Sequence, residues 1–598
     1  MRRNKDFILA GVLAIVLSFA LFGNGIVGDF VFDDTIVIVG NPLIGDPSKF
    51  TEIFTTPYFA YQPRPGLYRP LTIASHSLNA FVFGQSPISF HIVNILLHAL
   101  ASFLVFVFIY RLSDRITASL GSLIFMFLPI HVEAVTSIVG RAEILSFIFT
   151  LGALLLSIKK RYIFASLLFF MGLLSKETAI AFLPIFLFLD FFWHKKTAKS
   201  VFKSLLFLVP SLGVYALLRY VALGQYFLKN DATPIYNPIK FAPFLSGIWT
   251  SFKVFYLYIQ KSLYPISLSA DYSFNQIPLV GNFLSSIETM LGIVVLIGLL
   301  FLLFRSKNLL VKLGIVIFIA SYFVVSNWVF KTGTIMAERL MYMPSLGLAM
   351  LAAVIMQNLK LKAQNKVLFF ALHFSLCALF LWYGWLVIDR NKDWLSNKNL
   401  YESSYVAAPK SVVNQTNKAY LDFVEGKYPD AELRLKEVIV QAPEHVPALN
   451  LAAQNYKKLG ELKKAEELWK EAIRLRDDYL RAYLSLGILY YENGYFASAE
   501  KVLTEAVEIY PRWSEVLFLA LAKISLDKND EAIQLISAYS GTNPAEKELK
   551  FALGLAYFKK GETDKAFQYF EQVKDPKVKM EDFLKTFQGS EVIILGEF

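Results

Sequence analysis

Cysteine is almost absent from this 598-residue chain, and its single copy, Cys377, lies in an apolar run. One cysteine excludes a disulfide framework and a cysteine-based metal site. Charge is also scarce, because Asp, Glu, Lys and Arg make up 18% of the residues, against about 25% in an average soluble domain. Since 55% of the residues are hydrophobic, lipid must solvate much of the chain. The sequence also lacks a glycine-rich phosphate loop.

The apolar residues are distributed unevenly along the chain. Phe, Leu, Ile and Val dominate up to about Lys392, and the remainder is charged and alanine-rich. The cations behind the net charge of +11 form short clusters between apolar runs, which is typical of a membrane protein and does not indicate nucleic-acid binding. We predict an all-α protein of four parts. They are a polytopic helical membrane domain at 1–392 (first outer loop 28–90), a linker at 393–412, an α-solenoid at 413–580 and a tail at 581–598.

Eleven apolar segments are predicted to cross the membrane, with the N-terminus inside. A spanning helix needs about 20 apolar residues. With an odd number of spans, the basic clusters all fall on the inner side and the solenoid lies outside. Residues 245–265 contain Lys253 and Lys261 and would break the parity, so we interpret them as interfacial or re-entrant. The predicted spans are 7–27, 91–110, 116–130, 143–158, 162–174, 179–193, 201–223, 283–304, 309–330, 341–357 and 367–388.

The hairpin from Tyr162 to Trp193 has short arms. Each arm is about 20 Å long, whereas the hydrocarbon core is about 30 Å thick. Its tip, Ser175–Lys176–Glu177, should therefore lie below the outer surface, where charges persist only in a hydrated cavity lined by protein. The alternative is an exposed turn between two short helices.

The predicted outer loops and segment tips carry both acids and bases. A carboxylate there can take a proton from a hydroxyl group, and Arg or Lys can hold a phosphate and stabilise its developing charge. Taken singly, each motif also has a structural interpretation, such as a solvated turn or a local ion pair. The candidate residues are Asp33, Asp34, Arg69, His131, Glu133, Arg141, Glu143, Lys176, Glu177, Glu338 and Arg339.

Three of these structural alternatives are specific. Glu133 and Glu143 could both pair with Arg141 on one short helix, and Glu338–Arg339 could be a local ion pair. His131 has no neighbours at metal-ligand spacing, which favours a structural or hydrogen-bonding role over a zinc site.

A 34-residue period begins near Val413. Alanines recur at 431, 465, 499, 532 and 566, and glycines at 426, 460, 494 and 561. This is the tetratricopeptide (TPR) signature, in which small residues allow two helices to pack closely within each repeat. Five repeats fit, and in the fourth Asp527–Lys528 replaces the glycine. Such a solenoid binds polypeptide in its concave groove, or alternatively serves only to scaffold assembly or dimerisation.

Motifs along almost the whole chain resemble those of one family, the transmembrane-and-TPR protein O-mannosyltransferases of the GT-C superfamily. The short repeat array is similar to that of a prokaryotic member. The motifs, in order, are FVFDDT, YRPLT, PIHVEAVTSIVGRAE, LLSKET, SADYSFNQIPL, MAERLMYMPSLG and RNKDWLSNKNLYESS.

The resemblance implies an inverting transfer of a mannose-like sugar from a polyprenyl-phosphate donor to Ser or Thr hydroxyls of an exported protein docked by the repeats. It implies that Asp33 is the base and that Asp34 contacts the acceptor or a divalent metal (Mg²⁺ or Mn²⁺), whose involvement is left open. The other candidates would line the donor and acceptor sites, and we expect Arg141 first among the cations to hold the phosphate.

Two other functions remain open at this stage. The acceptor could be a lipid or a surface polysaccharide, or the chain could be a non-catalytic membrane scaffold that displays TPR repeats. The distribution of the basic clusters predicts a cytoplasmic N-terminus and repeats on the outer side, which is the periplasm for an inner (plasma) membrane or the lumen for the ER membrane of a eukaryotic host. Its partners would be the lipid-linked donor, a polypeptide and membrane lipid, with no nucleic acid.

Overall fold

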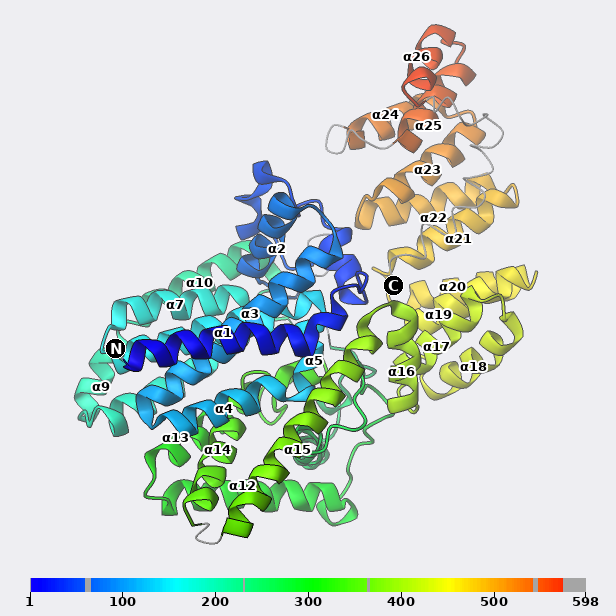
Figure 1. The fold of residues 1–598 in the computed structure, drawn as a ribbon. Coiled ribbons are helices and arrows are strands. Elements are labelled where there is room, and N and C mark those ends of the chain that lie inside the picture. The colour runs from blue at the N-terminus through cyan, green and yellow to red at the C-terminus, as the bar shows by residue number, and fades with distance from the viewer. Residues whose placement is uncertain (1, 60–65, 230–231, 363–365, 541–546, 574–598) are drawn as a thin grey trace. The chain divides into compact units, whose positions relative to one another are not determined.

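The computed structural model describes residues 2–59, 66–229, 232–362, 366–540 and 547–573, and these residues are helical with no β-strand among them (Figure 1). The all-α prediction is thus confirmed. They form two compact units, one that runs to Asn414 and one that begins at Gln415.

The described residues of the first unit form sixteen α-helices. In chain order they are α1 (Arg2–Phe22), α2 (Pro70–Phe83), α3 (Pro87–Leu112), α4 (Arg115–Phe127), α5 (Val132–Thr136), α6 (Arg141–Ile158), α7 (Tyr162–Ser175), α8 (Phe182–Phe188), α9 (Ala198–Leu205), α10 (Val209–Leu223), α11 (Phe244–Leu263), α12 (Ile287–Arg305), α13 (Leu309–Val325), α14 (Ser345–Lys362), α15 (Lys366–Asn391) and α16 (Asn397–Ala407).

Five helical segments among the described residues are long and apolar enough to cross a membrane, or six when the bent pair Arg115–Phe127 and Pro129–Thr136 counts as one span. Three further apolar helices are shorter. The chain is therefore a membrane protein. The predicted count of eleven spans is not confirmed, although a helix covers each predicted segment. Helix α11, predicted to be interfacial or re-entrant, is not among the candidate spans.

Helix α3 lies at the centre of this unit, in contact with α1, α4 and α6. Its N-terminal half buries the polar side chains of His91, Asn94 and His98, which a helix surrounded only by lipid could not do at acceptable cost. Helices α13 and α14 are another closely packed pair. Gly347 permits this approach, because a Cβ atom there would collide with the Gly314 carbonyl of the facing helix.

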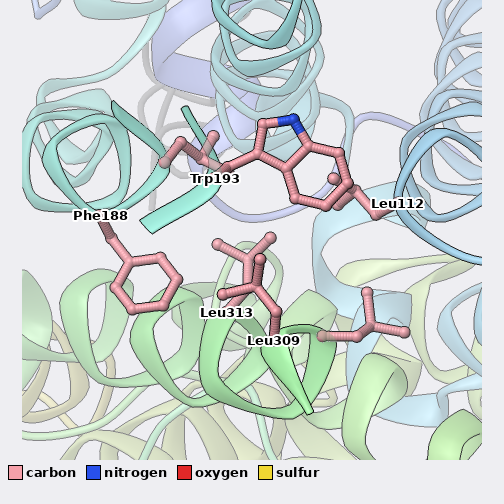
Figure 2. A pocket seen from close by; sticks show the side chains of 7 residues that line it. Leu112, Phe188, Trp193, Leu309 and Leu313 are labelled. Atoms are coloured by element: carbon pink, nitrogen blue, oxygen red, sulfur yellow. The ribbon is translucent and has the colours of Figure 1, made fainter. Parts of the chain in front are cut away.

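An apolar cavity of about 10 Å³ lies near the C-terminal end of α3 (Figure 2). Leu112, Phe188, Trp193, Leu309 and Leu313 point towards it. A void of this size holds one water molecule at most, and an apolar void usually stays empty. This cavity is a packing gap and cannot hold a substrate.

The second unit consists of paired helices. Each pair buries its repeat alanine, and Ala431, Ala465, Ala499 and Ala532 have no exposed surface. In chain order the helices are α17 (Val412–Val424, its first three residues in the first unit), α18 (Tyr428–Gln441), α19 (Val446–Lys458), α20 (Leu462–Leu475), α21 (Leu480–Glu492), α22 (Phe496–Ile509), α23 (Trp513–Ser525), α24 (Asn529–Ser540), α25 (Lys547–Lys559) and α26 (Thr563–Val573).

The turns between paired helices explain the glycine period. Gly426, Gly460, Gly494 and Gly561 have φ angles between 75° and 85°, a left-handed conformation that only glycine adopts without cost. Asp527 occupies this position in the fourth repeat and adopts φ 58°.

The predicted linker, 393–412, contains a helix. Helix α16 and the residues up to Asn414 pack in the first unit. The predicted tail, 581–598, lies outside the described residues.

Candidate active site

Asp34 is buried, with 1% of its surface exposed, and it binds two backbone amides. Its Oδ2 accepts the Val31 N–H at 3.1 Å and its Oδ1 accepts the Val139 N–H at 2.9 Å. These bonds fasten the first outer loop to the turn before α6. Burial raises the pKa of Asp34 to about 7, although both amides lower it. The carboxylate is an anchor for the loop, because both of its oxygens already have partners.

Asp33 has a different environment from its neighbour. Its side chain is partly exposed and makes no hydrogen bond or ion pair with any other residue that the structure describes. Burial raises the pKa of Asp33, and Arg339 and Arg69 lower it. The preceding residue, Phe32, has φ 57°, a left-handed conformation that costs an L-residue roughly 1–2 kcal/mol. The amide of Phe32 donates to Asn397 Oδ1 at 2.9 Å and holds this strained turn in place.

Three ion pairs surround Asp33 in the first unit. Each joins a cation to a glutamate from a different element, and each is partly or fully buried. Three of the four carboxylates in this set are thus paired with a cation, and Asp33 is the one without a direct partner. The pairs are Arg69 with Glu177, Lys176 with Glu143, and Arg339 with Glu133. We call these six residues and Asp33 the charged cluster.

Arg69 and Glu177 form a bidentate pair. Arg69 Nη2 donates to Glu177 Oε1 at 2.7 Å and Nε donates to Oε2 at 3.1 Å. The guanidinium also lies 5.1 Å from the ring centre of Tyr58. Against the raising effect of burial, Arg69 lowers the pKa of Glu177 to about 2. The residue before Glu177, Lys176, pairs with Glu143, and both side chains are only 5% exposed. Lys176 of the hairpin tip thus lies among protein side chains, whereas Glu177 keeps 36% of its side chain exposed.

Arg339 is held by Glu133 at two points. Its backbone N–H donates to Glu133 Oε2 at 2.8 Å, and its Nη1 contacts Oε1. The side chain of Arg339 remains 31% exposed, whereas that of Glu133 is 1% exposed. Arg339 Nε and Nη2 have no hydrogen-bond acceptor among the described residues, so they are available to a ligand.

Arg141 is fully buried and bound to neutral acceptors. Its Nε donates to Asn94 Oδ1 at 2.7 Å and its Nη2 to Asn79 Oδ1 at 3.0 Å, and the Ser75 and Phe90 carbonyls accept two further bonds. A phosphate could reach this guanidinium only by displacing these partners. The geometry therefore argues against the predicted phosphate contact of Arg141, which instead joins α2, α3 and α6.

Glu338 and His131 make their hydrogen bonds to residues outside the charged cluster. Glu338 Oε1 accepts the Tyr272 hydroxyl and the Ser269 N–H, both at 2.6 Å. His131 is buried against the rings of Phe125 and Tyr342, and its Nε2 lies 2.8 Å from Ser345 Oγ. These contacts give both residues structural environments.

A divalent metal does not fit these residues well. Among the described residues no group of three or more His, Cys, Asp or Glu side chains is placed to hold a metal ion. Both oxygens of Asp34 bind backbone amides, and Asp33 alone would supply one ligand group, whereas Mg²⁺ prefers several oxygen ligands in octahedral geometry.

Two contributors to this region were not predicted from the sequence. Tyr58 is 4% exposed and packs on Arg69, and no motif marks it. Tyr272 lies within the SADYSFNQIPL motif, so its position beside Glu338 could have been suspected from the motif, although its contact could not.

Fold and cluster together define a helical membrane protein with TPR repeats and an ionisable site at the ends of its helices. A tetratricopeptide repeat family model matches residues 450–512 and 519–577. Over most of its length the chain is similar to the "Protein O-mannosyl-transferase F38B6.6" of Caenorhabditis elegans, with 28% identity over 70% of this chain and 61% of the relative. Human TMTC1 is 27% identical over 75% of this chain and 57% of its own length. Mouse TMTC3 is 24% identical over 92% of this chain and 69% of its own length.

The predicted resemblance to the transmembrane-and-TPR protein O-mannosyltransferases is thus confirmed. The chain spans between 57% and 69% of the length of these three relatives. Among solved structures, MamA of strain AMB-1 matches 27% of this chain and 95% of its own, with 22% identity and a TM-score of 0.25. A tetratricopeptide repeat protein from Parabacteroides merdae matches 30% of this chain and 72% of its own, with 20% identity and a TM-score of 0.26.

Proposed function

We propose that this chain transfers a mannose-like sugar from a polyprenyl-phosphate donor to Ser or Thr hydroxyls of an exported protein. The observation that carries the proposal is Asp33, a partly exposed carboxylate without a partner beside two arginines. A base must keep its lone pairs available, and the other carboxylates of the charged cluster are each bound to a cation. The names of the relatives support the choice of sugar and acceptor.

The proposed reaction is a single displacement at the anomeric carbon. Asp33 accepts the proton of the acceptor hydroxyl while the hydroxyl oxygen forms a bond to that carbon. The bond from the anomeric carbon to the phosphate oxygen breaks, and the polyprenyl phosphate leaves with both electrons of that bond. Attack from the face opposite the phosphate inverts the anomeric configuration. No metal ion takes part in this scheme.

Arg339 and Arg69 are the cations we assign to the phosphate. Both are partly exposed, and each has guanidinium nitrogens with no acceptor among the described residues. Arginine suits a phosphate because its planar fork can donate two parallel hydrogen bonds. Lys176 is more deeply buried and bound to Glu143, so it contributes charge at a distance.

The arrangement in the cell is also part of this proposal. The N-terminus would be cytoplasmic, and the charged cluster and the repeats would face the periplasm, or the ER lumen in a eukaryotic host. The solenoid would dock the acceptor polypeptide. A lipid-linked donor could then enter the cluster from the bilayer, and the acceptor from the aqueous side.

The test is transfer by the purified, vesicle-reconstituted protein from polyprenyl-phosphate mannose to a Ser/Thr-rich peptide. Asp33→Asn should lower the rate by roughly 100- to 10,000-fold, the range that a general base contributes, without lowering thermal stability. Asp29→Asn is the matched control, since Asp29 is an exposed aspartate of the same loop. Wild-type transfer by the Asp33→Asn variant would refute the mechanism. Transfer to lipid or polysaccharide but not to peptide would refute the proposed acceptor.

A further inference from the structure

The short helix Glu338–Met341 directs two neighbouring charged side chains to different places. Arg339 turns to Glu133 in the charged cluster. Glu338 turns to the loop after α11, where it is fully buried. Because adjacent residues share a backbone, whatever fixes Glu338 also restricts where Arg339 can lie.

Glu338 is fixed by a closed triad of hydrogen bonds. The Tyr272 hydroxyl donates to Glu338 Oε1 at 2.6 Å and accepts the Ser269 N–H at 2.9 Å. The same N–H lies 2.6 Å from Glu338 Oε1. On the other side, Arg390 Nη2 lies 3.7 Å from Glu338 Oε2, which is too long for a hydrogen bond. Tyr272 and Ser269 therefore supply the short bonds that orient this carboxylate.

The loop that carries Tyr272 is bound in turn to the chain just before the repeats. Asp271 Oδ1 accepts the Ser411 hydroxyl at 2.6 Å. Asn414 Nδ2 donates to the Asp271 carbonyl at 3.2 Å and to Ser269 Oγ at 3.3 Å. These bonds link residues about 140 positions apart in the sequence, all within the first unit.

Backbone pairing reinforces this connection. The Val412 N–H donates to the Phe274 carbonyl at 2.7 Å, and the Asn275 N–H donates to the Lys410 carbonyl at 3.0 Å. Four hydrogen-bonded backbone groups thus join the loop directly to the segment 410–412. From Val412 onwards the chain continues as the first helix of the solenoid.

We propose that Tyr272 and Glu338 are positioning residues that set Arg339 against Asp33, and that the loop 269–276 connects this setting to the segment leading into the repeats. The inference rests on the proposed function, since it assigns a role in the same transfer. Neither residue touches substrate in this scheme. Their effect passes through the backbone of Arg339, and hence through the phosphate contact and the charge that Asp33 experiences.

Tyr272→Phe is the decisive variant because it removes only the hydroxyl. The aromatic ring stays, and so does its contact with Lys261, whose Nζ lies 4.8 Å from the ring centre. A displaced Arg339 stabilises the leaving phosphate less well, so kcat should fall roughly 10- to 100-fold, a range typical of a catalytic group misplaced by about 1 Å. The KM for acceptor peptide should stay within twofold. The acidic limb of the pH–rate profile should move to higher pH, because Arg339 would no longer lower the pKa of Asp33 as strongly.

Tyr383→Phe is the matched control. Tyr383 is also buried, and its hydroxyl donates to the Leu263 carbonyl at 2.9 Å, with no contact to Glu338. It should leave kcat and the acidic limb unchanged. Ser411→Ala removes the hydrogen bond to Asp271, which lies further from Glu338. This variant should also lower kcat, but by a smaller factor than Tyr272→Phe.

Each outcome decides between the two proposals. An unchanged kcat and acidic limb in Tyr272→Phe, together with loss of transfer in Asp33→Asn, would overturn only the positioning inference. If Tyr272→Phe lost thermal stability without a shift of the acidic limb, the hydrogen bonds of Tyr272 and Glu338 would have a structural role only, which would likewise overturn the positioning inference. Full activity of Asp33→Asn would overturn the assignment of Asp33 as the base, and a wild-type protein that transfers no sugar would overturn the proposed function itself. Should Tyr272→Phe fail to fold, Ser411→Ala supplies the same two readouts.

Discussion

The ion pair of Lys176 and Glu143 in the membrane unit is more deeply buried than the Arg512–Glu515 pair of the repeats, in which Glu515 is buried but Arg512 is 26% exposed. Lys176 and Glu143 are each 5% exposed, and Glu133 is 1% exposed. In the repeats, Lys470 and Glu466 form an i,i+4 pair with exposed fractions of 56% and 32%. A buried pair costs several kcal/mol of desolvation per ion, whereas an exposed one costs and contributes little.

The charged cluster departs further from the most stable arrangement than the repeats do. The repeats follow the local rules closely, with small residues at helix contacts and glycine at every left-handed turn between paired helices except that of Asp527. The charged cluster of the membrane unit has one buried ion pair, two partly exposed pairs, a carboxylate without a direct partner and a strained turn at Phe32. Such departures from the stable choice gather at sites that do chemistry.

The largest expected effect is on the buried pair of Lys176 and Glu143. Lys176→Met leaves Glu143 charged and buried without its partner, which should lower the free energy of unfolding by about 3–5 kcal/mol. The matched change in the repeats, Lys470→Met, should cost less than about 0.5 kcal/mol. Thermal unfolding in detergent measures both. The double variant Lys176→Met/Glu143→Gln should regain more than half of the loss, and equal effects of the two single variants would remove the contrast between the regions.

The adjacent aspartates should separate stability from activity. Asp34→Ala leaves the buried Val31 and Val139 amides without an acceptor, and should lower the free energy of unfolding by about 1–3 kcal/mol. Asp33→Ala removes a desolvated carboxylate that has no partner, so stability should be unchanged or slightly higher while transfer is lost. Chemical unfolding and a transfer assay on both variants check this. A stable Asp34→Ala protein would mean that the loop is anchored elsewhere.

The sequence predicts the repeats well because their contacts are local. Ala465 and Gly460 recur at a fixed spacing, because Ala465 is buried within its helix pair and Gly460 forms the left-handed turn between two neighbouring helices. The same residues could not predict the pairing in the membrane unit. Local pairing of Glu133 with Arg141 is a reasonable expectation from spacing, yet Glu133 binds Arg339, 206 positions away.

In the candidate site, too, the sequence predicts which residues belong together but not which contacts their side chains make. Motifs identify Asp33, Lys176–Glu177 and Glu338–Arg339 as a set, and charge parity predicts one shared face. The direction of each side chain depends on long-range packing, so spacing could not reveal that Arg141 binds neutral amides or that Glu338 points to Tyr272. Burial of Lys176 at the hairpin tip could be predicted, because it follows from helix length alone.

The pH dependence of transfer should depend on the arginines around Asp33. A base works only when deprotonated, so the rate should fall as the pH falls through the raised pKa of Asp33. Arg339 and Arg69 lower that pKa, and Tyr58 and Asp34 also face this site. The double variant Arg339→Gln/Glu133→Gln removes one lowering charge without leaving a carboxylate unpaired, so the acidic limb should move to higher pH.

The control for this shift is Arg339→Lys, which keeps the charge and should leave the acidic limb near its wild-type position even if the rate falls. A limb that stays in place in the double variant would mean that a group other than Asp33 is the base. No equivalent sensitivity is expected from charge changes on the outer surface of the repeats, such as Lys470→Gln.

The smallest expected effect lies in the fourth repeat, and it is a gain. Asp527 adopts the left-handed conformation that glycine supplies in the other four repeats. Its ion pair with Lys559 is long, 3.7 Å, and its own side chain is 85% exposed, so little would be lost with the carboxylate. Asp527→Gly relieves the backbone cost but adds freedom to the unfolded chain, and should raise the free energy of unfolding by roughly 0.5 kcal/mol. Asp530→Gly, within helix α24 one turn further on, should instead destabilise by roughly 0.5–1 kcal/mol. Opposite signs for these two glycine substitutions would show that turn conformation, and not loss of an aspartate, sets stability in the repeats.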